Sequence, residues 1–103
     1  MKRLLLLGLY ASNAAALQAP QFFKWSHTID VPSDIVITIE SVSATRLQSL
    51  LLKHGSRERA QAFSIIHGRA DAHWSCEIFI GPTNDWSGAL AHETKHCNGW
   101  THE

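Results

Sequence analysis

The chain has 103 residues, which is the size of one small domain. Nine basic residues balance nine acidic ones, and hydrophobic residues make up 45% of the chain. Because there is neither a basic stripe nor an acidic block, nucleic acids and anionic membrane surfaces are poor candidates as partners. A core of this size is often stabilised by a metal ion or a disulfide.

The first residues have the order of a secretory signal peptide. Two basic residues precede a short apolar run over residues 4–11, and small residues follow, including an A-x-A at 14–16. The run is well short of the roughly 20 residues that span a bilayer. The pattern therefore predicts a signal over residues 1–16, cleaved after residue 16 or 19, and an exported protein, periplasmic or secreted, with no stable membrane span. An uncleaved membrane anchor and an amphipathic helix of the folded domain are the alternatives.

A linker or N-terminal arm is expected next, over residues 17–33. This stretch has two prolines and no clear period, although Phe22, Phe23 and Trp25 can still dock on the domain. Residues 34–42 are a β-branched run typical of a strand.

The following segment, residues 43–55, predicts a helix. Leu47 and Leu51 lie at helical spacing, Ser43 is a good N-cap, and Gly55 is a natural stop.

Two strands and a second helix complete the chain. Residues 59–70 fit either a strand or a helix end, and we favour a strand. Residues 72–82 alternate well, and the side chains expected on one face are those of Trp74, Cys76, Ile78 and Ile80. Residues 83–99 read as a helix that Asn84 or Asp85 caps, with Trp86 and Leu90 in its buried stripe. The order of elements predicts a small α+β domain.

The last helix carries the pattern H-E-x-x-H-x-x-G-x-x-H. His92 and His96 lie one turn apart on one helix face, so both can point at one ion. Glu93 stands beside the first ligand, where a carboxylate can take a proton from water at the ion. Gly99 can end the helix and turn the chain, so that His102 returns as a third ligand. Three protein ligands leave one position open, as in catalytic zinc sites, so we expect Zn²⁺ as the cofactor. The alternative is a surface helix with solvated histidines.

The stretch HETKHCNGWTH resembles the long zinc-binding motif of the zincin metallopeptidases, specifically the metzincins. The resemblance implies that His92, His96 and His102 bind zinc and that Glu93 is the general base and acid. It also implies a minimal zincin-like domain over residues 34–103, in which a small twisted sheet packs on a backing helix and a C-terminal motif helix.

The resemblance further implies how substrate binds. In that family an edge strand borders the cleft and pairs with extended substrate, and residues 73–82 would be that strand here. Metzincins also continue to a turn whose methionine lies under the metal. Only Glu103 follows the motif in this sequence, and the single methionine is Met1, so the floor of the site must come from elsewhere or be absent.

These observations predict a zinc metallopeptidase, an endopeptidase that acts on peptide or protein substrates as a monomer. The alternative is a non-catalytic, exported zinc-binding protein that acts in an envelope or partner complex. In that case His67 or His73 would supply a fourth ligand.

The two cysteines form a candidate disulfide. Cys97 lies roughly 100° around the helix from His96, towards the sheet, and Cys76 is in the preceding strand. A Cys76–Cys97 bridge is allowed in an exported protein, and two buried thiols are the alternative.

Three further residues are candidates for contact with substrate: Trp74, Glu77 and Trp100. Each has a plainer interpretation. Trp74 belongs to the apolar face of its strand, and Glu77 to a solvated strand face. Trp100 can instead pack over the helix end and hold the third ligand in place.

Overall fold

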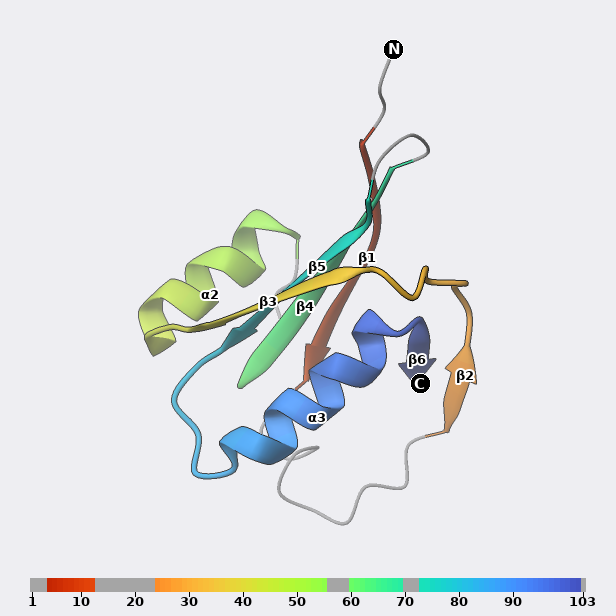
Figure 1. The fold of residues 1–103 in the computed structure, drawn as a ribbon. Coiled ribbons are helices and arrows are strands. Elements are labelled where there is room, and N and C mark those ends of the chain that lie inside the picture. Colours follow the sequence, from red (N-terminus) through yellow and green to blue (C-terminus); the bar gives the residue numbers. More distant parts are fainter. Residues whose placement is uncertain (1–3, 13–23, 56–59, 70–72, 103) are drawn as a thin grey trace.

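The computed structural model describes residues 4–12, 24–55, 60–69 and 73–102 (Figure 1). In this part of the chain, a four-stranded sheet has one helix on each face, and a separate two-stranded sheet lies beside the C-terminal helix. The predicted α+β class is confirmed.

The strands of the larger sheet lie in the order β1 (Leu4–Ser12), β4 (Ala62–Arg69), β5 (Ser75–Ile80) and β3 (Val36–Ser41). β4 pairs antiparallel with β1 and with β5, whereas β3 pairs parallel with β5. β5 is therefore a central strand, and the prediction that residues 73–82 form the edge strand is wrong. The physical reason is that both edges of β5 are paired, with β4 on one side and β3 on the other. This central position buries Cys76, Ile78 and Ile80 under α3.

Alternation along β4 and β5 separates two buried clusters. The cluster facing α3 (Trp86–Cys97) consists of Ala62, Ile66, Cys76, Ile78, Ile80, Ala89 and Cys97. The cluster facing α2 (Ala44–Lys53) consists of Leu47, Leu51, Phe63, Ile65 and Phe79. Even-numbered residues of β4 and β5 thus face α3, and odd-numbered residues face α2.

Both helices begin and end at the predicted signals. The Ser43 hydroxyl accepts a hydrogen bond from the Arg46 N–H at the start of α2, and Gly55 follows its end with φ +82°. The Asp85 carboxylate accepts a bond from the Gly88 N–H at the start of α3, and Gly99 takes φ +94°.

The prediction for Trp86 is wrong. Its side chain is 40% exposed, and its indole N–H donates to the Ser41 hydroxyl at the end of β3. Trp86 is the first residue of α3 and lies at the end of the sheet rather than over it, so the buried stripe begins one turn later, at Ala89. Leu90 is partly buried against the cluster, as expected.

The N-terminal segment is an edge strand, which the sequence did not suggest. β1 runs antiparallel to β4, with register pairs from Leu4 opposite Arg69 to Ser12 opposite Ala62. The alternative of a helix is therefore wrong for this stretch. Cleavage as a signal stays a prediction, and the small residues at 14–16, like Phe22 and Phe23, lie outside the described residues. Within the described ranges, neither helix has the length and apolar character to cross a bilayer.

The small sheet ties the end of the chain to the predicted arm. β2 (Trp25–His27) pairs antiparallel with β6 (Trp100–His102), which places Trp25 opposite His102. The docking expected of Trp25 is confirmed, and residue 102 is held in a strand pair.

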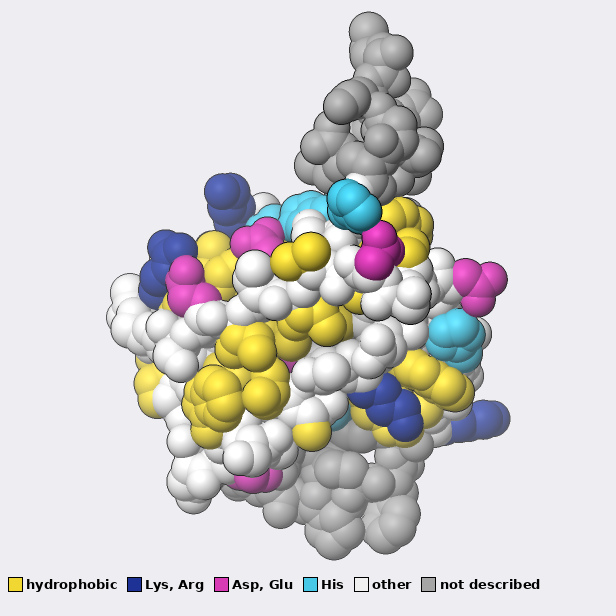
Figure 2. Space-filling model, viewed as in Figure 1, with side chains coloured by type: hydrophobic (Ala, Val, Ile, Leu, Met, Phe, Trp, Pro, Cys, Tyr) yellow, Lys and Arg dark blue, Asp and Glu magenta, His cyan; other side chains and the backbone are white. Residues whose placement is uncertain are grey.

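Four large apolar residues of the described part of the chain are exposed. They are Val36, Ile39, Leu52 and Trp86. Figure 2 shows hydrophobic side chains interrupted by polar and charged ones on the face that carries β3 and α3. The β3 edge carries Glu40, whose carboxylate lies 3.4 Å from the Arg46 guanidinium. Charge on an edge strand disfavours pairing with another strand.

Candidate metal centre

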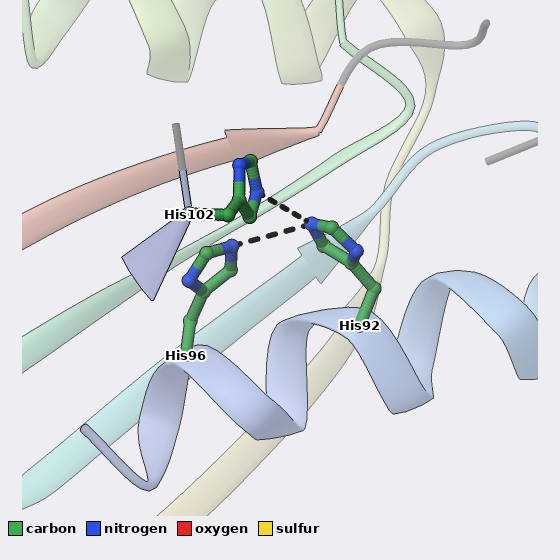
Figure 3. A group of neighbouring side chains, drawn as sticks. All are labelled: His92, His96 and His102. Carbon is green, nitrogen blue, oxygen red and sulfur yellow. Dashed lines mark hydrogen bonds between the residues drawn. The ribbon is translucent and has the colours of Figure 1, made fainter. Parts of the chain in front are cut away.

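Three imidazoles converge at the end of α3 (Figure 3). His92 and His96 come from α3, and His102 comes from β6. The His92 Nε2 atom lies 3.1 Å from the His102 Nε2 atom and 3.2 Å from the His96 Nε2 atom. Nitrogen ligands at about 2.0–2.1 Å in a tetrahedral zinc shell lie about 3.3 Å apart. The two distances from His92 are close to this value, and the ligand nitrogens of all three residues lie within 4.8 Å of one another, so these three histidines can hold a metal ion.

A backbone carbonyl sets the tautomer of His96. The His96 Nδ1 atom lies 2.8 Å from the Trp100 carbonyl oxygen. A carbonyl oxygen only accepts, so Nδ1 carries the proton and donates it. In the neutral ring, Nε2 is then an unprotonated nitrogen that faces the other two imidazoles, which is the form needed in a metal ligand.

Burial keeps two of the imidazoles neutral. It lowers the pKa of His92 to about 4, and the charge of nearby His102 adds to this effect. It lowers the pKa of His96 to about 3; the bond to the Trp100 carbonyl opposes this shift, while His92 and His102 add to it. Both rings are therefore unprotonated at neutral pH, as metal binding requires.

Trp25 packs against the whole histidine group. Its ring centroid lies 5.1 Å from that of His92, 5.2 Å from that of His96 and 4.8 Å from that of His102. The Lys95 ammonium lies 4.6 Å from the same ring. Trp25 thus gives the three imidazoles a shared apolar wall. Sequence reasoning expected docking but not this position, because only the pairing of β2 with β6 brings Trp25 to the site.

Glu93 faces the sheet from the neighbouring position on α3. Its side chain is fully buried, and the Ser64 hydroxyl donates to its Oε1 atom at 3.0 Å. Ser64 lies in β4 on the face towards α3, between Ala62 and Ile66. Sequence reasoning missed it. The sequence does carry a signal for it: Ser64 is the one polar residue in the apolar stretch 62–66, and it shares a strand face with Ala62 and Ile66.

The other candidate ligands lie elsewhere. His67 Nε2 lies 2.9 Å from Glu77 Oε1, and both are on the α2 face of the sheet, opposite the three histidines. His73 Nδ1 lies 2.8 Å from the exposed Asp34 carboxylate. Among the described residues, the one cluster able to hold a metal comprises His92, His96 and His102. The fourth ligand expected of a closed site thus does not come from His67 or His73.

The three candidate substrate residues lie in different surroundings. Trp74 is half-buried against the cluster under α3, and Glu77 is on the opposite face. Trp100 lies in β6, and its ring is 5.1 Å from that of His27. Contact of these residues with substrate stays a prediction.

A disulfide joins Cys76 in β5 to Cys97 at the end of α3, as predicted, with the two Cα atoms 5.8 Å apart. It anchors the motif helix directly after His96. Such a bridge persists in a non-reducing environment.

A search of known families, curated proteins and solved structures finds no match to this chain. The resemblance to zincin metallopeptidases therefore stays a prediction, carried by the motif.

Proposed function

We propose that this protein is an exported, zinc-dependent peptidase with the metzincin-type ligand set. The observation that carries the proposal is the convergence of ligand nitrogens from His92, His96 and His102, which all lie within 4.8 Å of one another. The described residues add no fourth ligand, so a coordination position is left for substrate or water. When bound, zinc supplies a Lewis acid that polarises a carbonyl and makes water more acidic.

The acid–base role falls to Glu93. It follows His92 directly on α3, and the Ser64 hydroxyl orients its carboxylate through Oε1. In the proposed reaction the carboxylate takes the proton that water loses as it attacks the peptide carbonyl. Glu93 then returns the proton to the departing amine, and a free carboxyl group and a free amine result.

Two features of the chain support the proposal that the protein is exported. The disulfide suits an oxidising compartment, and the N-terminal pattern is that of a signal peptide. The same two features also suit a non-catalytic zinc-binding protein, so the test must separate zinc binding from cleavage.

The decisive experiment compares Glu93→Gln with the unmodified protein loaded with one equivalent of zinc. The amide keeps the shape of the side chain and can still accept the Ser64 bond, so zinc affinity should stay unchanged. Cleavage of an unstructured protein substrate should fall by about 100-fold or more, since the group that moves the proton is lost. Glu40→Gln is the matched control, because Glu40 lies on the exposed edge of β3.

Normal cleavage by Glu93→Gln would refute the mechanism. Absence of cleavage by the unmodified protein would favour the non-catalytic alternative. The absorption spectrum of the cobalt-substituted protein then distinguishes three protein ligands plus water from four protein ligands.

A further inference from the structure

β4 contacts α3, the helix that carries most of the proposed site. β5 covers one edge of β4, and β1 covers the other. A strand edge without a partner presents a row of backbone N–H and C=O groups that can pair with an extended chain. The outer edge of β4 would be such a surface wherever β1 is displaced.

The register places this edge beside Glu93. Ser64, which donates to the Glu93 carboxylate, is a β4 residue, and its register partner in β1 is Tyr10. β1 also contacts α3, the helix that carries Glu93 and His92. Glu93 is fully buried and His92 is 8% exposed while β1 is in place. Any strand on this edge therefore runs past the acid–base group.

The segment that occupies the edge suits such a surface. Residues 4–12, LLLLGLYAS, contain no charge and no proline. The opposite edge of the sheet, on β3, instead carries the charged Glu40–Arg46 pair. The two edges thus differ in chemistry, and among the described residues β1 pairs with the outer edge of β4.

We propose that the outer edge of β4 is a docking surface for one extended, uncharged strand, and that this chain's own residues 4–12 occupy it in competition with substrate. The inference rests on the proposed function in one respect, the identity of the competitor, which is a peptide substrate that pairs antiparallel with β4 in extended form. Removal of residues 1–16 as a signal would vacate the edge.

The test uses the full 103-residue chain, with its length verified by intact mass, and the double variant Leu9→Pro/Tyr10→Pro. Of two neighbouring residues in an antiparallel ladder, one donates its N–H across to the partner strand, and proline has no N–H to donate. The variant should release β1 from β4. Leu4→Pro is the control, since proline is tolerated at the first residue of a strand.

The first readout is hydrogen exchange in β4. Amides of β4 directed to β1 should exchange about tenfold faster or more in the double variant. Amides of β4 directed to β5 should stay protected, which verifies that the fold is intact. A chelator should also remove zinc faster, and any peptide cleavage should rise. A synthetic peptide of residues 1–12, added in trans, should reverse all three changes.

Unchanged exchange at the outer β4 amides would overturn the inference. So would faster exchange that the added peptide does not reverse. If exchange and zinc removal respond as expected but no variant cleaves peptide, the docking surface stands and the proposed peptidase function fails.

Discussion

Trp25 lies outside the motif but contacts every member of the histidine group. Its ring lies within 5.2 Å, centroid to centroid, of all three imidazoles. Contacts of this kind restrict the ring orientation of each ligand, and groups that orient ligands typically change metal affinity 10- to 100-fold when they are lost.

Replacement of Trp25 by alanine should therefore weaken zinc binding by about 10- to 100-fold. Trp25→Phe should recover most of the affinity, because an aromatic ring still fills the space. Zinc affinity can be measured by competition with a chromophoric chelator. Trp86→Ala is the control, because Trp86 is 40% exposed and bonds to Ser41 rather than to the histidines. Equal affinity of Trp25→Ala and the unmodified protein would show that the wall is dispensable.

Most of the site was predictable at the residue scale, for a reason that lies in helix geometry. The spacing of His92 and His96 makes them neighbours on one helix face. Gly99 predicts the turn that brings His102 back towards them. Trp25 and Ser64 could not be assigned in this way. Their positions depend on pairings between strands that are distant in sequence, and no local period encodes those pairings.

At the scale of the elements, the turn after α3 controls whether β6 reaches the site. Gly99 has φ +94°, and a Cβ atom there would collide with the Ile29 carbonyl oxygen. The Gly99 carbonyl in turn accepts bonds from the backbone N–H groups of Thr28 at 2.9 Å and Ile29 at 3.3 Å. The turn therefore fixes both β6 and the chain that follows β2.

Gly99→Ala should lower the free energy of unfolding by more than Gly55→Ala does. Gly55 also has positive φ, +82°, but a Cβ atom there meets no other atom within 4 Å. The control thus measures the backbone penalty alone, about 1–2 kcal/mol, and the excess in Gly99→Ala measures the collision. Zinc affinity should fall by about tenfold or more in Gly99→Ala only, because His102 shifts. Urea unfolding and zinc titration provide the two measurements, and equal losses in both variants would contradict the argument.

The elements that the sequence predicted are those with a strong local pattern. β3, α2, β4, β5 and α3 all form where β-branched runs, caps and alternation placed them. The error on β5 came from the family resemblance, because the alternation within one strand does not say which strands pair on either side of it. β1 was read as a signal because an uncharged leucine run is compatible with either role, and β2 has only three residues in which to show a period.

At the scale of the whole molecule, the site is held from several sides. The disulfide fixes the end of α3 to β5, the Ser64–Glu93 bond fixes its middle to β4, and the β2–β6 pair fixes the strand that carries His102. Folding therefore buries His92 and His96 together, and their protonation is linked to the stability of the entire domain.

This linkage predicts how the metal-free protein responds to acid. The pKa values of His92 and His96 are about 4 and about 3 in the folded state, whereas both lie near 6.5 in the unfolded chain. Above pH 6.5 neither state binds these protons, so the two histidines add no pH dependence. As the pH falls below 6.5, the unfolded chain takes up two protons that the folded protein excludes. The free energy of unfolding should then fall by up to about 1.4 kcal/mol per pH unit for each histidine.

Urea unfolding of the metal-free protein between pH 6.5 and 5.5 measures this slope, in a range above the ordinary titration of carboxylates. The double variant His92→Gln/His96→Gln removes both titrating groups and should be flatter over the same range. An equally steep slope in the variant would assign the acid sensitivity to other groups. A steeper loss of stability in the double variant than in the unmodified protein would contradict the direction of both pKa shifts, because His92 and His96 would then add stability as the pH falls.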